Sequence, residues 1–562
     1  MKSEIRQTAI GSGILKLDFN ERSDKNSLVE SDLAYEQNLW SYPSRQELEA
    51  ILAENFDLNT EQVLCTNGGD EAIYILMRLM SESGRIILPL PAFSQYLWGI
   101  KSWKLDASLI ESKADLSIDL EATIAEIKKQ KDSVTIITRP NNPTGELIGE
   151  ESLELIIETA EKNKGWVFLD EAYIEFCEHD CISSSLLQKH SNLVILRTLS
   201  KAYGLAGIRF GYLLGEINKI SAFGERCMPF NISSPSLSIA KRALEKENQY
   251  EVKGYCERII QNRNIIENML SDAGVKSFQG QANFVFLKLP TGLAKAITSY
   301  AEKNDILLKS FVEDGLADCL RIGIPYEIER LNIFLENVFS PKLICLDMDG
   351  VLIDTSDSYD EAVKRTVFKL SNQIIEQQQI TELRRSGGYN NDWAVSQKLL
   401  EILGMNIDLE TVTQEFQTIY LGENGEGLVN NETPLINPSL VKKITASNDQ
   451  KFCIVTGRPR KEAQSGQKLI RLESLELISL DDVAEPKPSP EGIKKMQNQI
   501  LQNNSALSFC TWMCGDNPDD MQAAVGSNSM AIGIGLDNQE ALYAAGADIV
   551  IASINEIEEW LA

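Results

Sequence analysis

The feature that most constrains the fold is an alternation of short β-branched runs with helical stretches, which occurs twice along the chain. The first series spans residues 60–215 and contains strand candidates such as RIILPL, SVTIIT, WVFLD and NLVILRT. Strands that alternate with helices predict a largely parallel sheet of the α/β class. A helix ends near Ser340-Pro341, and LICLDMDGV then opens the second series. We therefore place a domain boundary at residue 340.

The stretch between the two series has a different pattern. Residues 230–340 read as long helices, then the strands FVFLKL, ILLKSF and CLRIGI, then a final helix, which predicts a smaller α+β domain. No Gly/Ser-rich tether separates the halves, so we expect them to pack together. The predicted organisation is a large domain over 41–229, a small domain from 1–40 and 230–340, and a C-terminal domain over 341–562 with a helical cap over about 357–435.

Composition excludes several classes of protein. The chain of 562 residues carries 54 basic and 82 acidic side chains, a formal net charge of -28, whereas nucleic acids and anionic membranes require a basic face. No apolar stretch reaches signal-peptide or membrane-span character. The ten cysteines form no CxxC pair and only two histidines are present, so a zinc cluster is not expected. We predict a cytoplasmic protein with reduced thiols that acts on small molecules.

The segment RTLSKAYGLAGIRFG (197–211) is the most specific in the first series. Lys201 follows a predicted strand and can form a Schiff base with pyridoxal 5'-phosphate (PLP). Thr198, Ser200 and Arg209 lie around it and can bind the phosphate of that cofactor. The segment therefore predicts a PLP site.

Further segments supply the other groups that PLP chemistry needs. In NGGDEAI, Gly69 and Asp70 open a helix whose N-terminus favours a phosphate. In FLDEAY, Asp170 can pair with the pyridinium nitrogen and Tyr173 can reach the ring hydroxyl. Two more candidates follow from RPNNPTG and PAF: Asn142 as a hydroxyl partner and Phe93 as a stacking ring. Each motif alone is compatible with a helix cap or a turn, but the set in this order is typical of a PLP enzyme.

These motifs resemble the class I/II aminotransferases of PLP fold type I over nearly all of residues 1–340. KLDFNE, SYPSRQELEAILAE, QANFVFLKL and CLRIGIPYEIERL are most similar to histidinol-phosphate aminotransferase. The resemblance implies a large α/β domain with a small α+β domain, and a homodimer in which Tyr42 reaches the partner's cofactor. It also implies that Lys201 shuttles protons and that Arg321 binds a substrate carboxylate or phosphate.

The chain departs from that family at three places. Lys309 stands where the family has an arginine that contacts a substrate anion, Phe93 replaces the usual stacking tyrosine, and the usual Asn-Glu-Asn-Pro opening is NERSD. These changes concern the identity of the substrate rather than the binding of PLP.

The second series begins with LICLDMDGVLIDT (343–355), an apolar strand followed by Asp347 and Asp349. Two carboxylates at this spacing can bind Mg²⁺ and divide the chemistry, one attacking phosphorus and the other serving as acid and base. The alternative is a plain acidic loop. Downstream segments add a hydroxyl for a phosphoryl oxygen, a cation and further carboxylates for the metal: Thr456, Lys487, Asp516 and Asp520.

This constellation resembles the haloacid-dehalogenase superfamily over residues 342–562, a Rossmann-like fold with a helical cap. The resemblance implies that Asp347 is the nucleophile, that Asp349 protonates the leaving alkoxide and then activates water, and that Asp347 and Asp516 carry Mg²⁺. We include Asp349 and Asp520 among the candidate metal-site residues. An aspartate two residues after the nucleophile is typical of the phosphatases of the superfamily rather than its dehalogenases.

The predicted cap contains LRRSGGYNNDW (383–393). Arg384 and Arg385 of this segment are candidate substrate contacts, and a solvated helix end is the alternative. A cap can exclude water and select the substrate.

Three functional hypotheses follow. The first is a bifunctional enzyme that transaminates imidazole-acetol phosphate to histidinol phosphate, or an equivalent pair, and hydrolyses the phosphate ester. The second is a PLP-dependent decarboxylase or cyclase of an amino acid or phospho-amino acid, fused to a phosphatase of an unrelated small molecule. The third is that one half is a silent scaffold, which the full set of catalytic side chains in both halves argues against.

Overall fold

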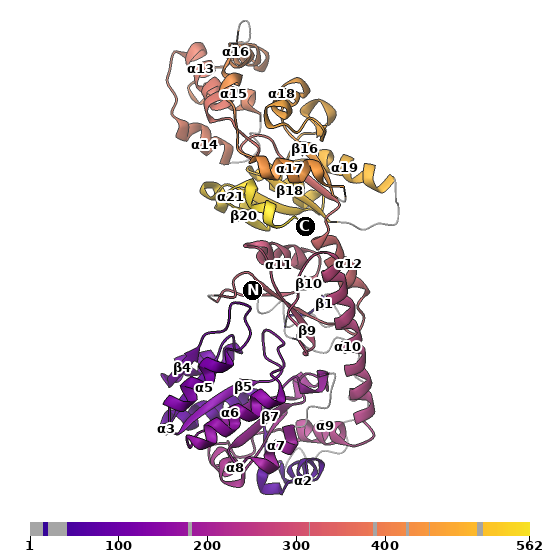
Figure 1. The fold of residues 1–562 in the computed structure, drawn as a ribbon. Helices are drawn as coiled ribbons and strands as arrows, with labels where there is room; N and C mark the ends of the chain where they lie inside the picture. The colour runs from indigo at the N-terminus through magenta and orange to yellow at the C-terminus, as the bar shows by residue number, and fades with distance from the viewer. Residues whose placement is uncertain are drawn as a thin grey trace. The chain divides into compact units, whose positions relative to one another are not determined.

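The computed structural model describes residues 15–18, 20, 42–177, 183–313, 315–385, 391–422, 426–448, 450–502 and 510–561 (Figure 1). The chain divides into two compact units. The first comprises Met1–Lys288, Asp305–Phe311 and Cys319–Asn332, and the second comprises Leu289–Asn304, Val312–Asp318 and Ile333–Ala562.

In the described part of the first unit, a seven-stranded sheet has the order β2-β8-β7-β6-β5-β3-β4. Strand β8 is antiparallel to both of its neighbours, and the remaining pairs are parallel, so the prediction of a largely parallel sheet is confirmed. The sequence pattern did not indicate β4, whose residues DASLI are partly exposed at the sheet edge. The strands are β2 (Val63–Thr66), β3 (Arg85–Pro89), β4 (Asp106–Ile110), β5 (Ser133–Thr138), β6 (Trp166–Asp170), β7 (Leu193–Thr198) and β8 (Gly211–Gly215).

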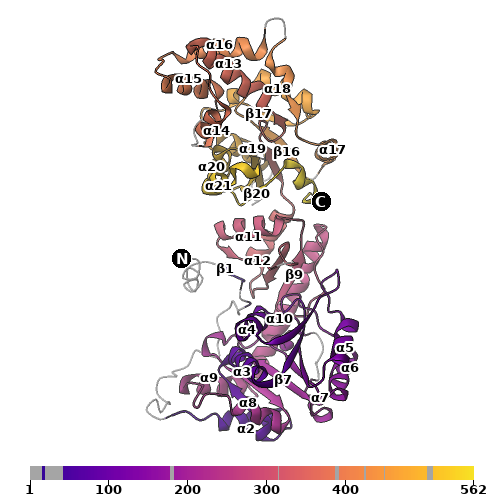
Figure 2. The same ribbon diagram turned by 90° about the vertical axis from the view of Figure 1, so that its left-hand side faces the viewer.

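Helices cover both faces of this sheet, which is why its central strands are apolar at nearly every position. Figure 2 shows α3 and α4 on one side of the strands and α5 and α6 on the other. Tyr96, Phe168 and Phe223 lie in the core under α3 and α4. The helices of this unit include α2 (Gln46–Asn55), α3 (Gly68–Ser83), α4 (Ser94–Trp103), α5 (Leu120–Lys129), α6 (Glu150–Lys162), α7 (Ser183–Lys189), α8 (Ile217–Gly224), α9 (Ser234–Leu244) and α10 (Gln249–Asp272).

The small-domain strands form two short sheets. Strands β11 (Lys309–Ser310), β12 (Cys319–Gly323) and β9 (Phe284–Lys288) are antiparallel in the order β11-β12-β9. The N-terminal strand β1 (Leu15–Lys16) pairs in parallel with β10 (Ile306–Leu307). Leu15 and Lys16 of the N-terminal segment therefore pair with a strand from the predicted small domain.

The compact units do not coincide with the predicted boundary at residue 340. Helix α11 (Leu293–Lys303) and most of α12 (Glu329–Phe339) cluster with the C-terminal residues. The contacts of α11 explain this grouping, because Lys303 and Ser299 bind the fully buried Asp548 carboxylate at 2.7 and 2.8 Å.

In its described residues, the second unit contains a six-stranded sheet, parallel throughout, in the order β17-β16-β13-β18-β19-β20. This confirms the Rossmann-like prediction, although the short strand β20 was not predicted. The strands are β13 (Leu343–Leu346), β16 (Lys451–Val455), β17 (Glu476–Ile478), β18 (Thr511–Gly515), β19 (Met530–Ile534) and β20 (Ile549–Ile551). The accompanying helices are α17 (Pro438–Ala446), α18 (Arg460–Ile470), α19 (Glu491–Gln502), α20 (Pro518–Gly526) and α21 (Gln539–Ala544).

A helical cap is inserted between β14 (Ile353–Asp354) and β15 (Thr433–Pro434), which pair in antiparallel fashion. The cap has its own apolar core, which includes Val363, Leu399 and Phe416. Its helices include α13 (Glu361–Ser371), α14 (Gln377–Arg385), α15 (Asp392–Ile402) and α16 (Leu409–Leu421). Across the described residues, no helix combines the length and apolarity needed to cross a bilayer.

Candidate active sites

The predicted PLP residues gather where adjacent strands of the large sheet end. Asp170 is the last residue of β6 and Lys201 follows β7, its neighbour in the sheet. The Nζ atom of Lys201 lies 5.6 Å from the centroid of the Tyr173 ring. Ligands of open α/β sheets bind at the carboxyl ends of strands, so this is the expected edge.

Asp170 is buried and held by neutral donors. Its carboxylate accepts a hydrogen bond from the Tyr96 hydroxyl at 2.7 Å and one from the backbone N–H of Ala172 at 3.1 Å. Burial raises the pKa of Asp170 to about 6, and these hydrogen bonds oppose that shift. Both of these donors are neutral, and a buried carboxylate held by them fits the pyridinium nitrogen of PLP.

Tyr96 was not among the residues predicted from the sequence. It lies on α4, three residues after Phe93, and is completely buried. Its ring meets that of Phe93 edge to face at 6.3 Å between centroids. The one available signal was the spacing within AFSQY, since residues three apart share a helix face.

The raised pKa of Asp170 predicts pH-dependent cofactor binding. The carboxyl group becomes neutral as the pH falls through about 6, so the affinity of the cofactor-free protein for PLP should decrease there. Asp170→Asn should bind PLP at least about tenfold more weakly above that pH, since it loses a buried ion pair. Fluorescence titrations of both proteins at several pH values measure this. The ionisation of the cofactor itself affects the PLP affinity of both proteins equally. The difference between their pH profiles therefore reports the ionisation of Asp170. Parallel pH profiles would contradict the prediction.

The predicted phosphate cradle is assembled from separate segments. Thr198 Oγ1 lies 2.9 Å from Ser200 Oγ, and the Arg209 guanidinium donates to Asp70 at 2.5 Å. A Cβ atom on Gly211 would lie 2.9 Å from the backbone nitrogen of Gly69, so glycine lets β8 approach the N-terminus of α3. Hydroxyls, a guanidinium and a helix N-terminus are the groups that bind a phosphate. The cradle fits the cofactor phosphate.

Arg321 lies on β12 beside Asn142, and its side chain is largely buried. Nη1 donates to Asn142 Oδ1 at 2.7 Å and Nη2 donates to the Asp18 carbonyl at 2.7 Å. Its Nε has no hydrogen-bond partner among the described residues. Lys309 is directly opposite Arg321 in the β11–β12 register, and cross-strand neighbours lie close together. This arrangement offers two cations to an anionic substrate.

Three further residues predicted for the PLP site, Phe93, Tyr42 and Tyr173, have the following contacts. Phe93 is partly buried at the start of α4 and packs against the large-domain core. Tyr42 is 81% exposed, and its ring stacks on Phe230 at 4.5 Å. Its contact with a second subunit therefore stays a prediction. Tyr173 accepts a hydrogen bond from Asn20 at 3.1 Å, a contact that the sequence did not predict.

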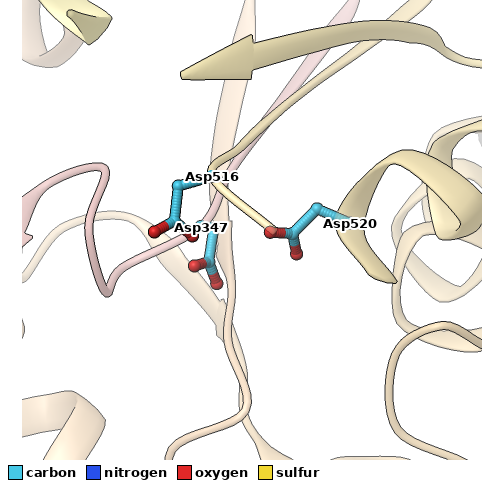
Figure 3. A group of neighbouring side chains, drawn as sticks. All are labelled: Asp347, Asp516 and Asp520. Carbon is cyan, nitrogen blue, oxygen red and sulfur yellow. The ribbon is translucent and has the colours of Figure 1, made fainter. Parts of the chain in front are cut away.

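The phosphatase centre lies at the carboxyl ends of two adjacent strands, β13 and β18. Asp347 directly follows β13, Asp516 directly follows β18, and Asp520 lies on α20. One oxygen of each carboxylate lies within 4.8 Å of the others, as Figure 3 illustrates. Oxygen ligands of this kind suit Mg²⁺.

Lys487 partly compensates this negative charge. Its ammonium lies 2.6 Å from Asp347 Oδ1 and 2.5 Å from Asp520 Oδ1. Burial raises the pKa of Asp347 to about 7, and burial also raises the pKa of Asp516 well above its usual range. When all three carboxylates are ionised, they and one ammonium leave two negative charges, which a divalent cation would balance. The cation would in turn favour the ionised forms. The site therefore fits Mg²⁺.

Glycine is required at position 350, where the loop after β13 passes this centre. Its φ is +70°, and a Cβ atom there would lie 2.0 Å from Asp516 Oδ2. Gly350→Ala should displace the Asp516 carboxylate and weaken Mg²⁺ binding about 10- to 100-fold. A Mg²⁺ titration of phosphate release measures this. Gly404→Ala is the matched control, because Gly404 has a φ of +81° and open space at the Cβ position. An equal Mg²⁺ requirement in both variants would contradict the prediction.

The remaining catalytic candidates lie beside the cluster. Thr456 is buried after β16, and its hydroxyl accepts a hydrogen bond from the backbone N–H of Arg458 at 3.1 Å. The Asp349 carboxylate is not in the group formed by the other aspartates and instead contacts the Arg458 side chain at 2.5 Å. Arg458 was not predicted, although it stands only two residues after Thr456, which was.

In the cap, Arg384 has protein partners. It pairs with Asp360 at 2.6 Å and with Asp392 at 2.5 Å, so it links cap elements. The side chain of Arg385 and residues 386–390 lie outside the described residues. The end of the same predicted loop does reach a cleft. The residues lining this cleft are Asp349, Tyr359, Asn391, Asp392, Trp393, Gly457, Arg458, Pro459, Glu462 and Leu480.

The two centres thus define a fold type I PLP enzyme and a phosphatase-type domain with a cluster of aspartates at its sheet edge. Residues 16–337 match the model of aminotransferase class I and II, and residues 344–534 match that of haloacid dehalogenase-like hydrolase. The first match covers more than half of the sequence. The chain belongs to the class I and II aminotransferases and carries a haloacid dehalogenase-like hydrolase domain at its C-terminus, and both are enzyme domains.

The first domain is similar in sequence or in structure to several named enzymes. Histidinol-phosphate aminotransferase of Pectobacterium carotovorum is 33% identical over 310 residues, which are 54% of this chain and 85% of that protein. The Sinorhizobium meliloti histidinol-phosphate aminotransferase in complex with PLP has a TM-score of 0.52 at 24% identity, over 60% of this chain and 94% of that chain. L-threonine-O-3-phosphate decarboxylase of Porphyromonas gingivalis has a TM-score of 0.50 at 20% identity, over 58% and 98%. The structural likenesses show the fold alone.

Proposed function

We propose that the chain interconverts imidazole-acetol phosphate and histidinol phosphate by transamination and hydrolyses the phosphate ester of the resulting amino alcohol. The named activity of the Pectobacterium relative supports the first reaction. The metal-site carboxylates and Lys487 support the second. We further propose that the protein is cytoplasmic and a homodimer, with the exposed Tyr42 at the subunit contact.

The observation that best supports a phosphorylated substrate is the pair of cationic side chains on neighbouring strands. Lys309 faces Arg321 across the β11–β12 ladder, and the Nε donor of the buried Arg321 has no partner in the part of the chain that the structure describes. A dianionic phosphate can accept from both side chains, and the guanidinium fork can bind it bidentately. Lysine in place of the family's arginine retains the positive charge and loses only the second fork.

In the transamination, PLP supplies the electron sink when bound. Lys201 would then move the proton at the substrate carbon that bears the nitrogen. Asp170 would keep the ring nitrogen protonated, because a buried carboxylate favours a cation beside it. Asn142 would be oriented by the hydrogen bond that it accepts from Arg321 at 2.7 Å, which connects substrate binding to the cofactor site.

In the hydrolysis, a carboxylate oxygen of Asp347 would attack phosphorus and form an aspartyl-phosphate. The bond between phosphorus and the ester oxygen breaks, and Asp349 gives its proton to the departing alkoxide. Lys487 and Mg²⁺ would neutralise charge on the phosphoryl oxygens. Asp349 would next take a proton from water, which attacks the aspartyl-phosphate, releases phosphate and restores both carboxyl groups.

The cleft beside Asp349 suits an aminated substrate. Glu462 lies in its lining, and its two carboxylate oxygens accept hydrogen bonds from the neutral groups of Gln417 at 2.8 Å and Tyr359 at 2.5 Å. It has no ion-pair partner within 4 Å among the described residues, so it keeps its negative charge unpaired in the cleft. Trp393 offers an aromatic face in the same cleft. A carboxylate and an aromatic ring favour an ammonium group. This supports a reaction order in which transamination precedes dephosphorylation.

One assay tests both proposed reactions. The protein is incubated with PLP, Mg²⁺, histidinol phosphate and 2-oxoglutarate, and glutamate and inorganic phosphate are followed while each component is omitted in turn. We expect glutamate formation to require PLP and 2-oxoglutarate, and phosphate release to require Mg²⁺. Turnover of the amino substrate without 2-oxoglutarate would replace transamination with decarboxylation or cyclisation. If the protein binds PLP but forms neither product, histidinol phosphate is not its substrate. A screen of other amino-alcohol phosphates then tests the two reaction classes.

A further inference from the structure

Arg458 lies on the loop after β16 and binds two carboxylates at once. Its side chain is only 2% exposed. Nε and Nη2 donate to Asp349 Oδ1 at 2.8 and 2.5 Å. Nη1 and Nη2 donate to the two carboxylate oxygens of Glu432, each at 3.0 Å. The planar fork of an arginine is suited to hold two such partners in a fixed relation.

Glu432 is itself immobilised at the base of the cap. It directly precedes β15, one of the paired strands through which the chain enters and leaves the cap. Its side chain is 2% exposed, and its Oε1 also accepts hydrogen bonds from Tyr420 at 2.8 Å and from Ser358 at 3.3 Å. The ring of Tyr359 adds a cation–π contact with Arg458 at 4.9 Å. The arginine is therefore anchored on the cap side by several contacts.

Asp349 is the less constrained partner. Its side chain is 35% exposed and lines the cleft together with Arg458. A half-exposed aspartate without a fixed partner would sample several rotamers, and small misplacement of a catalytic group has a large effect on rate. A two-point hydrogen bond from a buried arginine selects one orientation.

We infer that Arg458 is a positioning residue that holds the Asp349 carboxyl group toward the leaving-group oxygen, with Glu432 as its anchor. The inference rests on the proposed phosphatase function, in which Asp349 is the acid and base. It adds to that function a physical connection between the acid–base residue and the base of the cap. Arg458 binds no phosphoryl oxygen in this role and acts through Asp349.

The dependence of rate on the leaving group tests this inference. A nitrophenolate departs without a proton, whereas a phenolate and an alkoxide need the general acid. We expect Arg458→Gln to lower kcat/KM about a hundredfold for phenyl phosphate and for histidinol phosphate, and only a few fold for p-nitrophenyl phosphate. Arg458→Lys should be intermediate, because it keeps the charge and loses the fork. Glu432→Gln should also cause an intermediate loss of kcat/KM, because Arg458 keeps its hydrogen bonds to Asp349 and loses its charged anchor.

Asp349→Asn provides the reference pattern. It should show the same leaving-group dependence, and adding Arg458→Gln to it should cause little further loss, since both act on one proton transfer. Equal losses for all leaving groups in the Arg458 and Glu432 variants would show a merely structural role and overturn the inference. A lack of leaving-group dependence in Asp349→Asn would instead overturn the proposed acid–base role itself.

Two milder variants and the aryl phosphates make the test independent of the folding of Arg458→Gln and of the natural substrate. Removal of Arg458 leaves two carboxylates unpaired and can unfold the domain. Arg458→Lys and Glu432→Gln then carry the comparison, and a leaving-group-independent loss in both is the overturning result. The aryl phosphates do not depend on histidinol phosphate being the substrate, so a failed substrate proposal is distinguishable from a failed role for Arg458.

Discussion

Asp347→Asn should lower the rate of phosphate release at least about a thousandfold, because an amide cannot act as the nucleophile. Glutamate formation by the same protein should be unchanged, since Asp347 belongs to the second compact unit and Lys201 to the first. The assay with histidinol phosphate and 2-oxoglutarate measures both activities in one sample. Asp357→Asn is the matched control, since Asp357 is an exposed aspartate on the same segment. Retained phosphate release would remove Asp347 from the mechanism.

The same variant should not be less stable than the wild type without Mg²⁺. Burial raises the pKa of Asp347 to about 7, above the usual value of 3.8, so its ionised form destabilises the fold as pH rises through this range. Asparagine removes that charge, and Lys487 retains Asp520 as a partner. We expect the thermal midpoint in EDTA at neutral or higher pH to be maintained or raised, and the increase caused by Mg²⁺ to be reduced. A large fall in that midpoint would attribute lost activity to unfolding.

Lys201→Ala should abolish transamination to a comparable extent, because the described residues 171–177 after β6 and 199–210 after β7 hold no other lysine to bond covalently to PLP and move the proton. The visible absorption band that reports the bond between Lys201 and PLP should be lost. Phosphate release from histidinol phosphate should continue at the wild-type rate.

Lys246→Ala serves as the control, because this lysine is exposed on the same unit. Transamination that survives in Lys201→Ala would contradict the assignment. A loss of phosphate release in the same variant would show that the two reactions are coupled rather than independent, and would give the fusion a role beyond proximity.

The sequence was sufficient to select candidate reacting side chains that the structure places next to one another. Asp170, Lys201, Asp347 and Asp516 each stand at or just after an apolar run that became a strand of a parallel sheet. Carboxyl ends of adjacent parallel strands meet at one edge, so proximity in space followed from local patterns. The helical cap followed from the length of polar helical sequence between β14 and β15.

Strands β4 and β20 were not predicted because their sequences lack a long apolar or β-branched run. Strand β4 is a partly exposed edge strand, and β20 has only three residues. Both are formed by pairing with a neighbour rather than by a strong apolar pattern of their own.

The sequence alone therefore determined the two fold classes and the candidates for the nucleophile, the PLP lysine and the metal carboxylates, because each depends on a short motif next to a strand. The tertiary structure alone decided the partners that act on them. Tyr96 reaches Asp170 across 74 residues, and Arg458 reaches Asp349 across 109. Arg384 pairs within the cap, whereas the sequence left a substrate contact and a solvated helix end as alternatives for it. These contacts depend on how distant segments pack, which local periodicity and spacing do not encode.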